Sequence, residues 1–316
     1  MNLARLGLIL FVCLPATCPA QVQFRADVHL INVGFSVRDN QGKLVTDLHQ
    51  DDLEVIEDGL PQKIAFFARS QDVALNLGLV VDISGSQGAF VRQHHNDVRT
   101  FLSEVLSKRD RAFLACFAAS PRLVAEFSSS PKFLGDALEG YQNLKDKSQY
   151  PLLGPHELRV GGTSFYDAVY YSALQVLGNV NGGRKALIIF SDGEDNASAH
   201  HMMDAIEAAQ SNDVLLFSIR YTDVKNGRLN SRNKYGTSVM ERIARETGGA
   251  DFDAREHGLA EDFKLIGEQL RSSYELSYHS TNALEDDSFH KVVIRVKPPG
   301  LSVRAKTGYY SHPAEH

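Results

Sequence analysis

The sequence predicts an α/β protein in which a central, doubly wound and mainly parallel sheet is accompanied by β-strands from both ends of the chain. In the centre, short apolar runs alternate with longer segments of helical periodicity, which is typical of a parallel sheet with crossover helices. Towards both ends, apolar and polar residues alternate one by one, as in strands with a single buried face. A chain of 316 residues, 43% of them hydrophobic, is long enough for two domains.

Residues 1–20 are predicted to form a secretory signal peptide. Arg5 gives the segment a basic start, residues 6–14 form its apolar core, and Ala20 provides the small residue expected before cleavage. The segment is too short to span a bilayer. We therefore expect an exported chain, periplasmic or secreted, with no membrane span.

Cysteine usage agrees with this expectation. Cys13 and Cys18 raise the alternative of a lipoprotein, but the residues before them are valine and threonine, where a small residue is normally required. Removal of the leader leaves Cys116 as the single cysteine, so a disulfide within one chain is excluded. Cys116 lies in an apolar run and is expected to fill the core.

Strands are expected on either side of the central unit. Residues 28–38 alternate cleanly before a turn at 39–42, two further strands flank a turn at Asp58–Gly59, and three alternating runs follow residue 273. One β-sandwich built from both ends accounts for these strands, although two separate β extensions fit the same pattern. The expected division is 1–20 signal peptide, 21–71 N-terminal β segment, 72–272 central domain and 273–316 C-terminal β segment, packed against 21–71.

The central unit is expected to alternate strands and helices, with an exposed polar loop at 223–236. Right-handed crossovers would bring the ends of its first and fourth strands to one edge of the sheet. The predicted strands lie near 73–82, 111–118, 122–127, 185–191, 213–221 and 250–253, and the predicted helices near 87–107, 131–140, 164–178, 199–210, 237–247 and 258–272.

Five oxygen-bearing residues mark the candidate site. Asp82, Ser84 and Ser86 follow one apolar strand, Asp192 ends another, and Thr163 begins a helix after a glycine pair. In open α/β sheets, ligands bind at the carboxyl ends of the strands. Carboxylates and hydroxyls together form an all-oxygen set that suits Mg²⁺ or another hard divalent ion. The ordinary alternative is that these residues are helix caps and turn residues.

This spacing resembles the metal-ion-dependent adhesion site (MIDAS) of von Willebrand factor type A (VWA) domains, which have a Rossmann-like fold. The resemblance covers about residues 72–272, and the flanking segment 52–67 resembles exported VWA-related proteins known mostly from Acidobacteria. It implies that Mg²⁺, or Mn²⁺ or Ca²⁺, is held by hydroxyls and by carboxylates acting directly or through water. It also implies an open coordination position for an Asp or Glu side chain of a partner protein. The implied ligands are Asp82, Ser84, Ser86, Thr163 and Asp192.

Further polar residues around these loops are expected to line a rim that selects the partner. A second cation near two of the acidic residues is a weaker alternative, because acids before a helix usually complement its dipole. The expected rim residues are Gln87, Glu194, Asp195, Asn196, His200 and His201.

Two histidine pairs, His94–His95 and His200–His201, raise the question of a zinc site. Neighbouring residues on a helix point about 100° apart, so neither pair chelates one ion as neighbours. We expect these histidines to be solvated helix residues.

The sequence favours a non-catalytic binding protein that acts in adhesion, assembly or scaffolding. The alternatives are a structural envelope protein whose metal only stabilises the fold and, less favoured, a metal-dependent hydrolase. Residues 85–88 do not form a nucleophile elbow, and no glycine-rich phosphate loop with a lysine is present. The net charge of −6 gives no basic footprint for nucleic acid.

Overall fold

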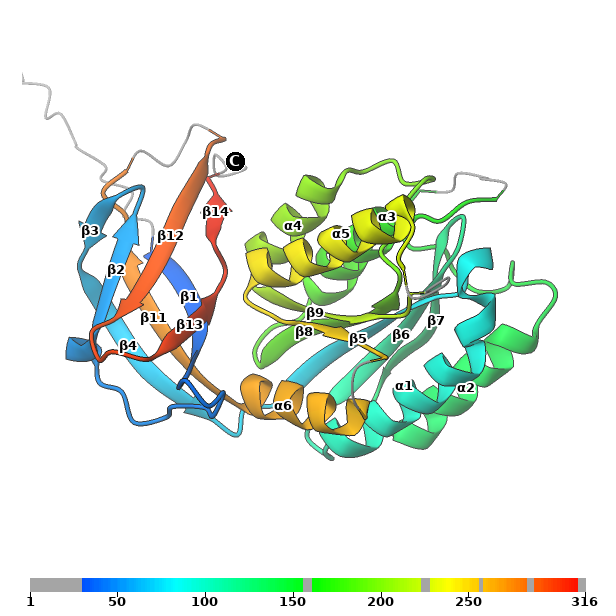
Figure 1. The fold of residues 1–316 in the computed structure, drawn as a ribbon, viewed down its shortest axis with the longest axis horizontal. Helices are drawn as coiled ribbons and strands as arrows, with labels where there is room; N and C mark the ends of the chain where they lie inside the picture. The colour runs from blue at the N-terminus through cyan, green and yellow to red at the C-terminus, as the bar shows by residue number, and fades with distance from the viewer. Residues whose placement is uncertain (1–29, 156–160, 223–227, 256–257, 283–286, 312–316) are drawn as a thin grey trace, which may run out of the picture.

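The computed structural model describes residues 30–155, 161–222, 228–255, 258–282 and 287–311. The predicted signal peptide lies outside the described residues. The chain forms a β-sandwich beside an α/β unit (Figure 1). In the described part of the chain, no helix has both the length and the apolarity needed to cross a membrane.

The sandwich consists of two four-stranded sheets, and each contains strands from both ends of the chain. All neighbouring strands within these sheets run antiparallel. The first sheet has the order β13 (Ser302–Ala305), β1 (Leu30–Arg38), β11 (Ser272–His279) and β4 (Ile64–Gln71); the second has the order β14 (Gly308–Tyr310), β12 (Phe289–Val296), β2 (Leu53–Glu57) and β3 (Leu60–Gln62).

The predicted single-residue alternation explains how these sheets pack. On β1, Val33, Phe35 and Val37 are buried, and they meet β11 and the second sheet in one apolar core. Phe35 stacks on Tyr274 with 5.3 Å between ring centroids. Because strand residues two apart share a face, the alternating residues of β1 all point into the core.

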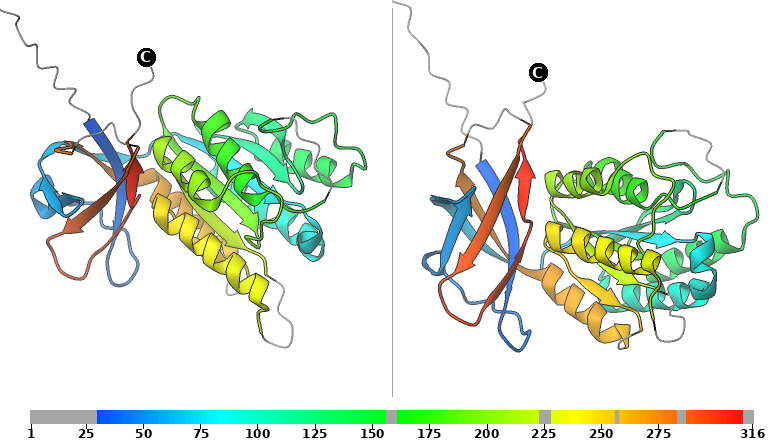
Figure 2. Two further views of the ribbon diagram at one scale, coloured as in Figure 1. Left: turned by 90° about the horizontal axis from the view of Figure 1, so that it is seen from above. Right: turned by 45° about the horizontal axis from the view of Figure 1, so that its top comes forward.

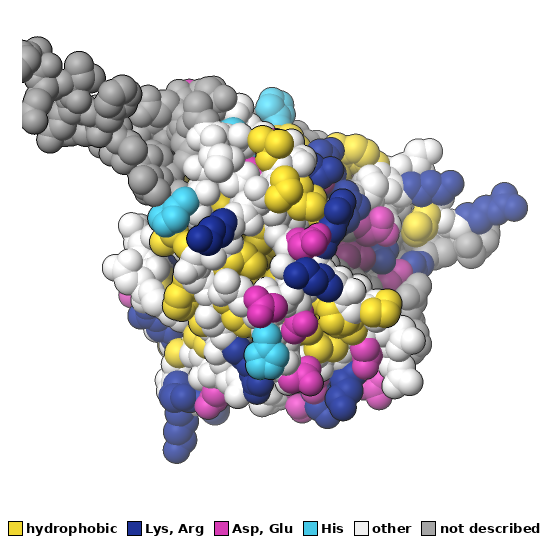
Figure 3. Space-filling view, turned by 90° about the vertical axis from the view of Figure 1, so that its left-hand side faces the viewer, with side chains coloured by type: hydrophobic (Ala, Val, Ile, Leu, Met, Phe, Trp, Pro, Cys, Tyr) yellow, Lys and Arg dark blue, Asp and Glu magenta, His cyan; other side chains and the backbone are white. Residues whose placement is uncertain are grey.

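Figure 3 views the molecule from the sandwich side. Acidic and basic side chains are mixed over this face, with apolar side chains between them, and no large area of one sign is visible among the described residues. This face therefore lacks the basic stripe expected of a nucleic-acid surface.

The α/β unit contains a six-stranded sheet, in agreement with the predicted fold class. All eight residues of its central strand are buried, as expected for a parallel strand covered on both faces. The order is β10 (Asp251–Asp253), β9 (Val214–Arg220), β8 (Arg184–Ser191), β5 (Leu75–Asp82), β6 (Arg111–Phe117) and β7 (Pro121–Ser128). Within this sheet, the edge strand β7 runs antiparallel to its neighbour β6, and the other neighbouring strands run parallel.

Helices cover both faces of this sheet, as Figure 2 shows. Short 3₁₀ turns η1 (Gln50–Asp52) and η2 (Gly85–Phe90) precede β2 and the first helix. One face carries α1 (Val91–Val105), α2 (Pro131–Asn143) and α6 (Leu259–Arg271); the other carries α3 (Phe165–Tyr171), its π-helical continuation η3 (Ser172–Leu177), α4 (Met202–Ser211) and α5 (Ser231–Thr247).

Several helix boundaries differ from the predictions. The helix predicted from residue 87 begins at Val91, because residues 85–90 form the 3₁₀ turn η2. The exposed loop predicted to reach residue 236 is wrong over 231–236, which belong to α5; residues 223–227 lie outside the described part of the chain. The Asn230 side chain accepts a hydrogen bond from the Asn233 amide and so caps this helix early. The helix predicted from residue 199 begins at Met202, because the preceding residues belong to a loop that is anchored elsewhere.

Asp110 joins the two places where the chain passes between the sandwich and the α/β unit. Its Oδ1 accepts from the Leu75 amide at 2.9 Å, at the start of β5. Its Oδ2 accepts from Arg271 at 2.6 Å, at the end of α6. Burial alone raises the pKa of Asp110, but hydrogen bonds from Arg271, Ser107 and Leu75 outweigh burial and lower it.

We predict that Asp110→Asn lowers the free energy of unfolding by about 2 kcal/mol at neutral pH, because it removes the charge that Arg271 pairs with and leaves backbone donors poorly satisfied. Since the folded-state pKa of Asp110 is lowered from 3.8, the deficit should be present above pH 3.8 and shrink as the pH falls below it. Urea unfolding at several pH values measures this difference.

The matched control is Asp72→Asn, which changes an exposed aspartate that pairs with exposed Arg109. Such pairs contribute little, so this variant should stay within about 0.5 kcal/mol of wild type. Equal losses in both variants would contradict the assigned role of Asp110.

Candidate functional site

The candidate site lies at the carboxyl ends of β5 and β8. These strands are parallel neighbours with Val81 opposite Phe190, so the residues that follow, Asp82 and Asp192, reach the same edge of the sheet. Both carboxylates are buried, with 0% and 4% exposure. The amino ends of the parallel strands lie next to the sandwich, so this edge faces away from it (Figure 1).

Asp82 is held by neutral donors on both oxygens. Oδ1 accepts from the Ser84 amide at 2.9 Å, and Oδ2 accepts from the Ser191 hydroxyl at 2.6 Å. Burial and then the negative charge of Asp192 raise the pKa of Asp82 to about 7. Two carboxylates therefore lie close together in a buried environment, and the side chains that hydrogen-bond to them carry no positive charge.

The loop after β5 adds two hydroxyls and an amide. The Ser84 and Ser86 hydroxyls lie 3.1 Å apart; Ser84 is buried and Ser86 is exposed. Gln87, expected on the rim, is instead 1% exposed and donates to Asp192 Oδ2 at 2.7 Å. Its position as the third residue of the 3₁₀ turn η2 places the amide inside the site, where it connects the loops after β5 and β8.

Thr163 is tied to the same edge through the loop after β8. Its amide donates to the Asn196 side chain at 2.8 Å, and its carbonyl accepts from the Asn196 amide at 3.0 Å. Gly162 has a φ of +96°, and a Cβ there would lie 2.6 Å from Asn196 Oδ1. The glycine before Thr163 is therefore required both for its backbone conformation and for this close approach.

Asp167, in the first turn of α3, anchors the loop that follows Asp192. It accepts from the backbone amides of Ala199 and His200, and its Oδ1 lies 2.7 Å from His200 Nδ1. The His200 ring also stacks on Tyr170 with 3.8 Å between centroids. His200 is thus an anchored loop residue and not a solvated helix residue. Asp167 was not among the residues predicted from the sequence. Its position in the first turn of the helix predicted from residue 164 was the available indication.

The remaining expected rim residues lie on the loop after β8. The Glu194 amide donates to Asp192 Oδ1 at 3.0 Å, and its side chain lies 3.4 Å from Arg232. Asp195 accepts from the Tyr166 amide at 3.2 Å. Burial raises the pKa of both acids, and Asp192 adds to the effect at Glu194. Asn196 and His201 are exposed.

The prediction that His94 is solvated is wrong. Its side chain is fully buried, and its ring meets Tyr221 edge-on at 4.2 Å. Burial lowers the pKa of His94 to about 4, so the ring is neutral at pH 7. The Tyr221 hydroxyl in turn donates to Asp97 at 2.6 Å. Position 94 lies on the same buried face of α1 as Val98 and Phe101, although its residue is a histidine.

The donor set at this edge fits a hard divalent cation. Among the described residues, the side chains that hydrogen-bond to the two carboxylates are neutral, namely those of Ser191, Ser84 and Gln87. Buried carboxylates need a counter-charge, and hydroxyl oxygens complete an oxygen-only environment. The residues therefore match the chemistry that a magnesium-type ion requires.

No protein-family model and no curated protein matches the sequence. Similar solved structures include an aerotolerance-related membrane protein from Bacteroides fragilis, with 14% identity over 62% of this chain and 98% of that chain and a TM-score of 0.47. Proximal thread matrix protein 1 from the mussel byssus, with a zinc-occupied MIDAS motif, shares 15% identity over 67% of this chain and 49% of its own, with a TM-score of 0.47.

A von Willebrand factor type A protein from Catenulispora acidiphila covers more of the chain. It shares 10% identity over 91% of this chain and 74% of that chain, with a TM-score of 0.45. The similar structures thus include VWA proteins. Because these scores are below 0.5 and the identities are low, none of them assigns a function to this chain.

We predict that, without metal, wild type loses stability relative to Asp82→Asn as the pH rises from 3.8 to 7. The pKa of Asp82 is raised from 3.8 to about 7, so the folded state binds more protons than the unfolded state in this range. The full change is bounded by roughly 4 kcal/mol. Unfolding of both chains in chelator from pH 4 to 7.5 tests this, with Asp72→Asn as a control that keeps the wild-type slope. A pH-independent difference would contradict the prediction.

Proposed function

We propose that this chain binds a divalent ion, Mg²⁺ or else Mn²⁺ or Ca²⁺, and through it recognises an acidic side chain of a partner protein. The observation that supports this most is the pair of buried carboxylates at one strand edge, hydrogen-bonded by neutral side chains. The proposed ligands are Asp82, Ser84, Ser86, Thr163 and Asp192.

The proposed partner chemistry follows from the ligand types. Hydroxyls are neutral ligands and the site holds only two carboxylates, so a bound divalent ion retains affinity for a further anionic oxygen. A partner Asp or Glu supplies that oxygen. Exposed Ser86 and the partly exposed loop at 194–201, which includes exposed Asn196 and His201, would border this contact.

The function proposed is that of a non-catalytic, exported adhesion, assembly or scaffolding protein. We propose domain limits at 71/72 and 272/273, close to where the chain leaves β4 and where α6 gives way to β11. A protein whose ion only stabilises the fold is the competing possibility. The two differ in whether partner binding, as distinct from folding, requires the ion.

We predict that Ser86→Ala lowers Mg²⁺ affinity at least about tenfold and abolishes partner capture while the chain remains folded, because an exposed hydroxyl ligand is lost without disturbing the core. The measurement is Mg²⁺ titration calorimetry, followed by capture from an envelope fraction in Mg²⁺ and in chelator. The captured protein is then retested with its exposed acidic residues neutralised.

The matched control is Ser103→Ala on α1, an exposed serine whose hydroxyl donates only to a carbonyl of its own helix. It should bind Mg²⁺ and the partner as wild type does. A partner retained equally in chelator and by Ser86→Ala would refute ion-mediated recognition. Loss of folding on ion removal would favour the structural role.

A further inference from the structure

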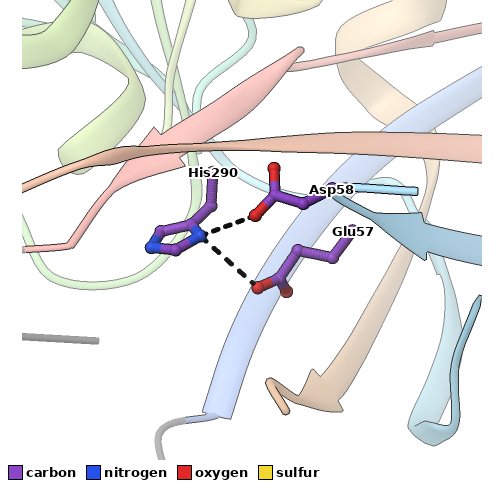
Figure 4. A group of neighbouring side chains, drawn as sticks. All are labelled: Glu57, Asp58 and His290. Carbon is purple, nitrogen blue, oxygen red and sulfur yellow. Dashed lines mark hydrogen bonds and ion pairs between the residues drawn. The ribbon is translucent and has the colours of Figure 1, made fainter. Parts of the chain in front are cut away.

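Three side chains with metal-ligand chemistry meet in the sandwich. Glu57 is the last residue of β2, Asp58 begins the turn to β3, and His290 lies on β12 (Figure 4). One ligand atom from each lies within 4.8 Å of the others. Among the described residues, this is the single group of three or more acidic, histidine or cysteine side chains that come so close.

The histidine directs one ring nitrogen at two carboxylates. His290 Nδ1 is 2.8 Å from Asp58 Oδ2 and 3.9 Å from Glu57 Oε1. Carboxylate oxygens only accept hydrogen bonds, so Nδ1 must carry either a proton or a metal ion. The other ring nitrogen, Nε2, lies 3.2 Å from the Ser288 hydroxyl, which orients the ring as partners of metal-binding histidines do.

Glu57 provides a separate indication that a cation belongs here. Its side chain is fully buried, and Figure 4 shows its carboxylate directed toward the His290 ring. Oε1 accepts from the Ser280 hydroxyl at 2.6 Å, Asn282 Nδ2 at 2.8 Å and the Tyr309 hydroxyl at 3.1 Å. Oε2 is buried and makes no well-formed hydrogen bond, although the Tyr278 hydroxyl is close enough that Glu57 adds to burial in raising the pKa of that tyrosine. A buried carboxylate with one poorly satisfied oxygen is costly, and a cation beside it lowers that cost.

We propose that Glu57, Asp58 and His290 bind a divalent transition-metal ion of the Zn²⁺, Co²⁺ and Mn²⁺ class. One imidazole and two carboxylates suit these ions better than Mg²⁺, which favours oxygen ligands. Asn282 Nδ2 lies 2.9 Å from Asp58 Oδ2. The same amide donates to Glu57 Oε1 at 2.8 Å and so holds the two carboxylates side by side.

The ion would join segments far apart in the sequence. Residues 57–58 form the end of β2 and its turn, whereas His290 lies on β12, opposite Tyr309 of β14. A ligand set that exists only when the N-terminal and C-terminal segments are paired binds the folded sandwich and not the unfolded chain. The site therefore acts as a structural clamp on the sandwich, independently of the strand-edge site.

Titration of the metal-stripped chain with Co²⁺ and Zn²⁺ in excess Mg²⁺ tests the proposal. Calorimetry should show one Zn²⁺ per chain, and Co²⁺ should give visible absorption typical of low-symmetry coordination. Proton–nitrogen correlation spectra of the histidine rings should show a shift at His290 Nδ1 on Zn²⁺ binding. Zn²⁺ should also raise the melting temperature.

Asp58→Asn and Glu57→Gln should each weaken Zn²⁺ binding at least about tenfold. Asp58 has a φ of +48°, a conformation that asparagine adopts readily, so the turn is retained. The control is Asp72→Asn, an exposed aspartate with a φ of +57°, which should bind Zn²⁺ as wild type does.

No Zn²⁺ binding in excess Mg²⁺, or binding that both variants leave unchanged, would overturn the proposal and leave an ordinary hydrogen bond between His290 Nδ1 and Asp58. If a variant does not fold, the wild-type histidine spectrum still decides the question: Zn²⁺ at constant pH should shift Nδ1 of His290, and an unchanged Nδ1 signal would overturn the proposal. Neither variant touches Asp82 or Ser86, so Mg²⁺-dependent partner capture should persist, and failure of one proposal is distinguishable from failure of the other.

Discussion

The parallel pairing of β5 with β8 is the constraint on which the candidate site depends. It places Val81 opposite Phe190 and so delivers Asp82 and Asp192 to one edge, where burial and like charge act together. The pKa of Asp82 would not be raised if β5 ended in water. The order of the strands therefore decides that the two carboxylates are neighbours, and this proximity contributes to the raised pKa of Asp82.

Loops complete the site only because other residues fix them. Gln87 bridges the loop after β5 to Asp192, and Asp167 gathers the amides of the loop after β8 onto α3. These contacts hold the hydroxyl-bearing segments at the edge without any cationic side chain. Hydrogen bonds to neutral donors preserve the negative charge that attracts a cation, whereas a lysine or arginine in the same place would cancel it.

The fold class and most strands and helices were predictable from the sequence, because single-residue alternation and helical periodicity follow directly from which faces are buried. The strand-end positions of Asp82 and Asp192 were predictable for the same reason. The burial of His94 and Gln87 and the anchoring role of Asp167 were not, because they depend on contacts between residues more than 30 positions apart or on the tertiary covering of α1. Likewise, α5 begins at Ser231 because Asn230 caps it, and this start is not evident from a segment that is polar throughout.

The cluster in the sandwich escaped sequence analysis because His290 lies more than 230 residues from Asp58. Its chemistry also differs from that of the strand edge. One set is all oxygen, and the other includes an imidazole nitrogen beside two carboxylates. Hard ions dehydrate for oxygen ligands, whereas transition metals gain most from nitrogen. The difference in ligand atoms would therefore let one chain bind two kinds of ion. A hard ion would bind at the strand edge, where a partner can reach it, and a transition-metal ion would bind in the β-sandwich.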